Sequence, residues 1–398
     1  MGVTLDHPIL DKKISFDENN YLSYGSSSIQ GYRSSYEDRL SCIIDKKIDS
    51  NIISSFVLLD GHGGSNSAEF CSHHLHKCIF DSEDKSTQEK DMFSDETIIK
   101  AFLKCDSDFK SFSEEKNDKS GTVCTSVLCC PYRYANYGIS IICSSIGTTM
   151  CVAYDCKVDD IIVMSTSHTP DNYIEKTRIK NSGGYVEQGR VNGTFALSRA
   201  FGDYDCKKNS KFGPREQAII AVPDIKRYDF SFDDKEITNN EIPYRFIVIG
   251  CKDIWEMGNE YVGTFIKTRL KEQDDGVYYK KRKKRLTDLY NDLNRSFSSK
   301  RDLYCGFETI EEKEGYDLDA ICSELLDFGI INKDLKTNLS VIIVMFFNEL
   351  KISSSHKYED DDCIDNENER LELIKDIFNS NTQQEDNSNI NDNLIVNT

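Results

Sequence analysis

Short apolar runs rich in β-branched residues constrain the fold of this chain more than any other feature of its sequence. They stand at residues 56–59, 127–130, 161–164, 246–249 and 341–347. Runs of this length are typical of buried β-strands, because buried helices need longer apolar segments. Helix-like stretches separate the runs, so the sequence predicts an α/β fold whose last strand returns to the core late in the chain.

The composition divides the 398 residues into three parts. We predict an N-terminal arm at residues 1–20, a main domain at 21–347 and an acidic tail, rich in Asn and Asp, at 348–398. Such a tail has too little apolar surface to order itself, so we expect most of it to be disordered. Within the main domain, the charged residues 273–317 are expected to form an insertion that carries a helix at 286–297.

Charge and cysteine content narrow the class of protein. The formal net charge is −19, and an acidic surface repels nucleic-acid backbones, so no nucleic-acid partner is expected. The 15 cysteines are scattered and form no paired CxxC motif, which indicates reduced thiols. No apolar signal core and no long apolar run is present, so we expect a cytoplasmic protein. We also expect the protein to be a monomer.

Two local features leave partners and location open. Residues 280–285 read KKRKKR, which suits a nuclear import signal, a dock for acidic partners or a solvated helix start. Gly2 follows Met1, but Asp6 stands where a myristoylation pattern needs Ser or Thr. Contact with a membrane is therefore expected only if Gly2 is lipidated.

The sharpest local motif is FVLLDGHGG at residues 56–64, where an apolar strand ends in a carboxylate. The glycines around His62 let the backbone turn tightly after Asp60. A carboxylate beside the carbonyl of Gly61 suits a hard cation such as Mg²⁺ or Mn²⁺. Taken alone, the motif is equally compatible with an Asp-Gly turn that holds no ligand.

A second charged group lies upstream, in GYRSSYEDR at residues 31–39. Glu37 and Asp38 are adjacent, and neighbouring side chains of a strand point to opposite faces, so only one could face a metal directly. Arg33 carries the planar guanidinium that binds phosphate oxygens in pairs. The alternative for this segment is an exposed charged strand.

Together with other segments in the same order, these motifs resemble the protein phosphatase 2C family of metal-dependent Ser/Thr protein phosphatases. The similar segments include SGT at 120–122, NYIEKTRIKNSGGYV at 172–186 and RVNGTFALSRAFGD at 190–203. The resemblance covers residues 1–272 and 318–347. It implies an α/β sandwich of two central antiparallel β-sheets flanked by helices, in α-β-β-α order.

The resemblance also implies a two-metal centre of Mg²⁺ or Mn²⁺ at one end of the sandwich. There a water held by the metals attacks a Ser or Thr phosphate in line. Carried over to this sequence, Asp60 would bridge both metals and Gly61 would offer its carbonyl. Glu37 and Asp38 would hold metal-bound waters.

Two further residues take the family's phosphate chemistry. Arg33 would grip the phosphate of the substrate phosphoprotein. His62 would protonate the leaving oxygen as a general acid. This half of the family's site is therefore present in the sequence.

Other acidic positions of the family pattern are not acidic here. Thr148 and Ser167 stand at two of them, and Lys252 and Thr337 stand at positions of direct metal ligands. A Lys ammonium has no acceptor atom, so it cannot ligate a cation. Two unit charges about 4 Å apart interact by about 4 kcal/mol at an effective dielectric of about 20. We therefore expect one weak cation site or none.

Two alternatives for this position stay open. The Lys252 ammonium could replace the first metal and pair with Asp60. A one-residue slip of the strand end could instead let Asp253 recover the ligand position, although such a slip flips side chains across a strand.

Three histidines and a tryptophan are further candidates for functional residues. His73, His74 and His76 could suggest zinc, but apart from two neighbouring cysteines they lack partners at zinc-ligand spacing, so we expect a partly exposed helix. Trp255 is the only tryptophan and is expected to pack in the core.

Two functional hypotheses follow. The first is a pseudophosphatase or strongly impaired enzyme that acts in phospho-signalling by binding a phosphoprotein, a kinase or another regulatory partner. The alternative is an active Mg²⁺- or Mn²⁺-dependent Ser/Thr phosphatase with a rearranged metal site.

Overall fold

The computed structural model describes residues 4–48, 51–82, 93–133, 137–156, 159–232, 244–296, 313 and 315–347. The chain divides into two units, Met1–Lys351 and Ile352–Thr398, and only the first contains described residues. Gly2 and the predicted tail at 348–398 lie outside them. None of the described helices is both long and apolar enough to cross a membrane.

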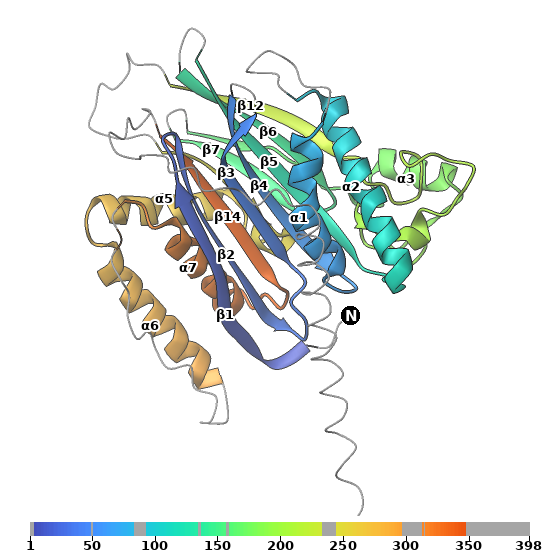
Figure 1. Cartoon of the computed structure of the whole chain (residues 1–398). Helices are drawn as coiled ribbons and strands as arrows, with labels where there is room; N and C mark the ends of the chain where they lie inside the picture. Colours follow the sequence, from blue (N-terminus) through green and yellow to red (C-terminus); the bar gives the residue numbers. More distant parts are fainter. Residues whose placement is uncertain are drawn as a thin grey trace, which may run out of the picture. The chain divides into compact units, whose positions relative to one another are not determined.

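Two antiparallel β-sheets form the centre of the first unit (Figure 1). The first sheet has the order β1-β2-β14-β13-β7-β8. Its strands are β1 (Thr4–Glu18), β2 (Leu22–Arg33), β14 (Leu339–Phe346), β13 (Arg245–Gly250), β7 (Met150–Asp155) and β8 (Asp160–Val163). The late strand β14 pairs with both β2 and β13, so the end of the domain lies in the middle of the sheet.

The second sheet has the order β12-β6-β5-β4-β3, and the short β11 also pairs with β5. Its strands are β12 (Asp224–Phe232), β6 (Tyr137–Ile146), β5 (Gly121–Arg133), β4 (Asn51–His62), β3 (Arg39–Ile48) and β11 (Phe201–Gly202). A separate small hairpin pairs β9 (Val186–Glu187) with β10 (Arg190–Val191).

Helices cover the outer face of each sheet (Figure 1). Helices α1 (Asn66–Phe80) and α2 (Asp95–Lys116) lie against the second sheet, and α7 (Leu318–Asn332) packs on β1, β2 and β14. The remaining helices are α3 (Tyr173–Asn181), the 3-10 helix η2 (Tyr204–Cys206), α4 (Lys252–Trp255), α5 (Asn259–Asp274) and α6 (Tyr278–Ser296). This order of layers confirms the predicted α-β-β-α sandwich.

Strand β4 shows why the apolar runs lack a polar face. Phe56 and Leu58 belong to the core between the sheets, whereas Val57 and Leu59 belong to the core under α1 and α2. All four side chains are fully buried, and each contributes about 1.5–3 kcal/mol by leaving water. The runs at 56–59, 127–130 and 246–249 lie wholly within strands, whereas those at 161–164 and 341–347 each extend one residue beyond a strand, β8 and β14. Strand β8 is a partly exposed edge strand.

The structure shows which elements the predicted arm and the charged insertion contain. The residues of the predicted arm form β1, which pairs with β2 over most of its length. The helix expected at 286–297 begins at Tyr278, so it includes the basic run. Tyr278, Leu286 and Tyr290 join the main core from one side of this helix, whereas Lys283 is exposed, so the helix is amphipathic from its start.

Candidate functional site

The two charged segments, at 31–39 and 56–64, meet at Gly61, which follows Asp60 near the end of β4. A Cβ atom on Gly61 would lie 2.4 Å from the main-chain oxygen of Glu37, so only glycine allows this approach. Glu37 and Asp38 lie in the loop between β2 and β3, and not on a strand as predicted. The loop can therefore present both carboxylates toward β4.

We predict that Gly61→Ala destabilises the protein by about 3 kcal/mol, because the added methyl group collides with backbone that cannot move aside. Chemical denaturation would measure the change. Gly213→Ala is the matched control, since the nearest atom to its added Cβ would be a flexible side-chain oxygen at 3.7 Å. Equal stability of the two variants would contradict the close contact between Gly61 and Glu37.

The start of β14 fixes the loop from the other side. The Oδ1 atom of Asn338 accepts a hydrogen bond of 2.9 Å from the main-chain N–H of Glu37. The hydroxyl of Ser340 donates to Oδ2 of Asp38 at 2.6 Å. These contacts span about three hundred residues of sequence, so they are made only when both sheets have formed.

Carboxylates crowd this end of the sandwich and disfavour one another's ionisation. Burial raises the pKa of Asp38 to about 7, and the nearby charges of Asp253 and Glu37 add to the effect. Burial also raises the pKa of Asp60 well above its usual value, and Asp38 and Asp253 add to it. Ionisation of the whole group therefore requires a compensating positive charge.

The donor set fits a divalent cation in part. Within the described part of the chain, no side chain donates a hydrogen bond to Asp60, so its oxygens remain free acceptors. Asp60 and the neighbouring Gly61 offer hard oxygen donors of the kind that Mg²⁺ and Mn²⁺ prefer. However, no group of three or more His, Cys, Asp or Glu side chains among the described residues is arranged as a complete metal site. The residues fit a cation that keeps much of its water.

Lys252 does not enter the site, so the suggestion that its ammonium pairs with Asp60 is wrong. Its side chain is 62% exposed, and its nearest carboxylate partner is Glu256, at 3.9 Å. Cys251 precedes helix α4, and Lys252 is the first residue of that helix. The repulsion expected between this lysine and a bound cation is therefore weakened by distance and by solvent.

Asp253 turns toward the site without any slip of the strand. Strand β13 keeps its register with β14 up to Gly250, and the chain then becomes helical. Successive side chains on a helix are turned by about 100°, not by the half-turn of a strand, so Asp253 faces differently from Lys252. The hydroxyl of Thr337 donates a hydrogen bond of 2.7 Å to Oδ2 of Asp253.

The remaining altered positions lie beside each other in the fold. Thr148 follows Gly147, whose N–H donates to Nδ1 of His168, and His168 follows Ser167. Neither Thr148 nor Ser167 forms a side-chain hydrogen bond with another described residue. Both positions therefore carry a hydroxyl where the resemblance places a carboxylate.

The structure adds Asp203, which the sequence reasoning did not single out. Nε2 of His62 lies 2.8 Å from Oδ2 of Asp203, and a Cβ on Gly121 would collide with both side chains. Burial alone would lower the pKa of His62, but Asp203 and then Asp60 outweigh it and raise that pKa. A protonated His62 can serve as a general acid. The end of the segment at 190–203 carried the only sequence signal for this partner.

Arg33 ends β2 close to the carboxylates, and its positive charge opposes the rise in the pKa of Asp60. No described residue forms an ion pair with its guanidinium within 4 Å. The guanidinium is partly exposed. It is therefore available for an external anion such as a phosphate.

The remaining candidates are structural. The histidines lie on α1, where His76 is buried between Ser55 and Ser41, and His74 stacks on Phe70. Trp255 is buried in the main core, as predicted. The cysteines of the described ranges are all free thiols, and most of them are buried.

Known proteins are similar to this chain over most of its length. The family model of protein phosphatase 2C matches residues 22–289. Protein phosphatase 1A of Bos taurus is 30% identical over 361 residues, which are 89% of this chain and 78% of that protein. Protein phosphatase 1B of Mus musculus is 29% identical over 387 residues, which are 94% of this chain and 83% of that protein.

Solved structures share the fold. A phosphatase from Toxoplasma gondii superposes with a TM-score of 0.63 at 19% identity, over 88% of this chain and 99% of that one. A sex-determining protein of C. elegans superposes with a TM-score of 0.52 at 17% identity, over 83% of this chain and 66% of that one. From its sequence motifs, its sandwich and these matches, the chain belongs to the protein phosphatase 2C family and carries its Ser/Thr phosphatase domain.

Proposed function

We propose that this protein is a strongly impaired member of its family, which binds phosphorylated Ser or Thr in partner proteins and releases phosphate slowly. One observation carries the proposal: the half of the site expected to bind phosphate is present, whereas neutral residues stand where the family resemblance places carboxylates of the other half. Arg33, His62 and Asp60 represent the first half, and Thr148 and Thr337 the second.

The electrostatics of the site support weak cation binding. Asp60 and Gly61 would hold a Mg²⁺ or Mn²⁺ ion, with Asp38 and Glu37 close enough to bind waters around it. The chemistry that such an ion supplies is activation of water and neutralisation of phosphate charge. Arg33 would hold the phosphate, and His62, kept charged by Asp203, would hold the proton for the leaving oxygen.

The proposed partners are phosphoproteins or the kinases that produce them. We propose that the protein acts as a monomer in the cytoplasm or the nucleus. Its net charge of −19 disfavours a nucleic-acid partner.

Binding to a phosphopeptide tests the first half of the site. Arg33→Ala is expected to weaken binding of a phosphoserine peptide by about tenfold or more, because a charge-assisted bidentate contact is lost. Calorimetry with phosphorylated and unphosphorylated peptides would measure it. Arg295→Ala is the control, since this arginine is 78% exposed on α6. An unchanged affinity in Arg33→Ala would refute the proposed phosphate contact.

The rate of phosphate hydrolysis tests the half of the site in which carboxylates are replaced. With millimolar Mn²⁺, the protein is expected to release phosphate about a hundredfold more slowly than protein phosphatase 1A, which would be assayed beside it. Similar rates for the two proteins would overturn the proposed impairment.

A second candidate is an active phosphatase with a rearranged site, and the orientation of Asp253 favours it. Held by Thr337 and close to Asp60, this carboxylate could replace the family's ligand at position 252. Rapid Mn²⁺-dependent release of phosphate that disappears in Asp253→Asn, but not in the exposed control Asp288→Asn, would establish this candidate.

A further inference from the structure

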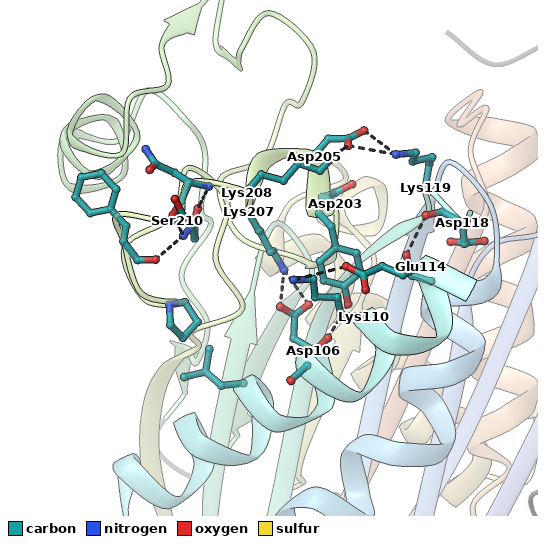
Figure 2. Close-up of a pocket in the computed structure, with 18 of the residues that line it drawn as sticks. Asp106, Lys110, Glu114, Asp118, Lys119, Asp203, Asp205, Lys207, Lys208 and Ser210 are labelled. Carbon is teal, nitrogen blue, oxygen red and sulfur yellow. Dashed lines mark hydrogen bonds and ion pairs between the residues drawn. The ribbon is translucent and has the colours of Figure 1, made fainter. Parts of the chain in front are cut away.

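A groove of about 750 Å³ runs beside the candidate site, between α2 and the segment at 203–217 (Figure 2). Figure 2 shows Asp106, Lys110 and Glu114 on α2. Asp203 and Lys207 belong to the segment opposite the helix, and Lys207 reaches across to Asp106. The groove is distinct from the carboxylate cluster, since Asp38 and Asp60 do not line it.

One end of the groove is continuous with the catalytic residues. Asp203 lines the groove and also contacts Nε2 of His62. Phe195 lines it too, and its ring centre lies 6.3 Å from that of His62. A polypeptide whose phosphorylated residue lies beside His62 could therefore continue directly into the groove.

The walls of the groove are held rigidly. The side chain of Lys207 is only 8% exposed and binds Asp106 of α2 at 2.8 Å, which joins the segment at 203–217 to the helix. The side-chain amide of Gln217 donates to the main-chain oxygens of Asn209 and Phe212, at 2.9 and 2.8 Å. The groove is thus formed before any ligand arrives, which reduces the entropic cost of binding.

Apolar residues line the groove at another point. Leu103 and Phe212 both line it, both are only partly buried, and neither belongs to a hydrophobic cluster of the described residues. Arg215 binds Glu96 through an Nη1–Oε2 contact of 3.1 Å, which ties the segment after Phe212 to the start of α2. Glu96 and Leu103 are about two helical turns apart on one face of α2, so Leu103 lies on the side of the helix to which this segment is tied.

The exposed charges along the rim nearly balance. Lys119 and Lys208 share one carboxylate, that of Asp205, and Lys110 lies 3.7 Å from Glu114. A groove with such mixed charge gives little preference for acidic or basic partners. The apolar end therefore offers the stronger basis for selection.

We propose that this groove binds the polypeptide flanking the phosphorylated residue, with an apolar side chain of that polypeptide packed against Leu103 and Phe212. The inference rests on the proposed binding of phosphoproteins. The lining residues of α2 from Leu103 to Glu114 span about 16 Å, which an extended chain covers with about five residues. The apolar side chain is thus expected within about five residues of the phosphorylated one.

A phosphopeptide library tests the proposal. Peptides with a central phosphoserine and about five random residues on each side would be bound to the immobilised full-length protein and sequenced. We expect enrichment of Leu, Met or Phe at one flanking position. A peptide with that residue should bind the double variant Leu103→Ala, Phe212→Ala about tenfold more weakly than the wild type, whereas a phosphoserine tripeptide should bind both equally.

A matched control separates local effects from loss of structure. Ile174 is 70% exposed on α3 and does not line the groove, so Ile174→Ala should change neither affinity. Both substituted residues of the double variant are partly exposed, and its thermal unfolding should match that of the wild type.

Two results would overturn the proposed role of the groove. One is the absence of any residue preference at the flanking positions, and the other is a preference that the double variant retains. Failure of the proposed function gives a different result, because the library would then bind equally well without its phosphate. Loss of tripeptide binding in the double variant would also count against the groove, since it would place these residues in the phosphate site.

Discussion

Asp60→Asn is expected to abolish the stabilisation of this protein by divalent cations. Added Mn²⁺ should raise the unfolding temperature of the wild type, because a ligand that binds only the folded state stabilises it. The variant lacks the central charged ligand, so its unfolding temperature should not respond. Phosphate release should fall below detection. Thermal unfolding and phosphate assays with and without millimolar Mn²⁺ would measure both effects.

Without cations, the same variant should be at least as stable as the wild type. Burial raises the pKa of Asp60 and, to about 7, that of Asp38, so the folded state binds protons more tightly than the unfolded state. Stability of the wild type should therefore fall as the pH rises from about 5 to about 7, and Asp60→Asn should reduce this fall. The exposed Asp288→Asn is the control. A cation-free variant that is much less stable than the wild type would show that Asp60 has a structural role.

Thr337→Asp is expected to raise phosphate release by about tenfold or more with millimolar Mn²⁺, because it returns a carboxylate to the site. In the absence of cations it should destabilise the protein, since Asp253 loses a hydrogen bond and gains a like charge. Binding of Mn²⁺, measured by calorimetry, should strengthen in parallel with turnover.

Lys252→Asp alone is expected to change turnover little, because the side chain at this position points to solvent near Glu256. Added to Thr337→Asp, it should give only a modest further gain through its negative charge. A large rescue by Lys252→Asp alone would mean that position 252 faces the cation, contrary to the structure.

The strands were predictable because their signal is local. Residues 56–59 are apolar at every position, which a strand with two buried faces requires, and both faces of β4 are indeed covered. The motif order was sufficient to indicate the family and the α-β-β-α sandwich. The basic run is harder to interpret, because its composition suits a solvated helix start, a nuclear import signal and a dock for acidic partners equally. The buried residues of this helix, such as Tyr278 and Leu286, indicate a helix only through their spacing in the sequence.

The candidate site was predictable as a set of residues, but not as a geometry. Sequence alone placed Asp60 at a strand end and Arg33 and Glu37 upstream of it. Their approach depends on the contact of Gly61 with the backbone of Glu37 in the loop between β2 and β3, which no local pattern encodes. The partnership of His62 with Asp203 likewise joins residues 141 positions apart.

Position 252 marks the division between the two kinds of information. The sequence determined that a lysine, which cannot ligate a cation, stands where the family resemblance places an aspartate. Only the tertiary structure decided where that lysine points, because the chain changes from strand to helix after Gly250 and turns Lys252 outward and Asp253 toward Thr337. A residue's chemistry is fixed by its identity, whereas its direction depends on backbone conformation that packing of the whole sandwich selects.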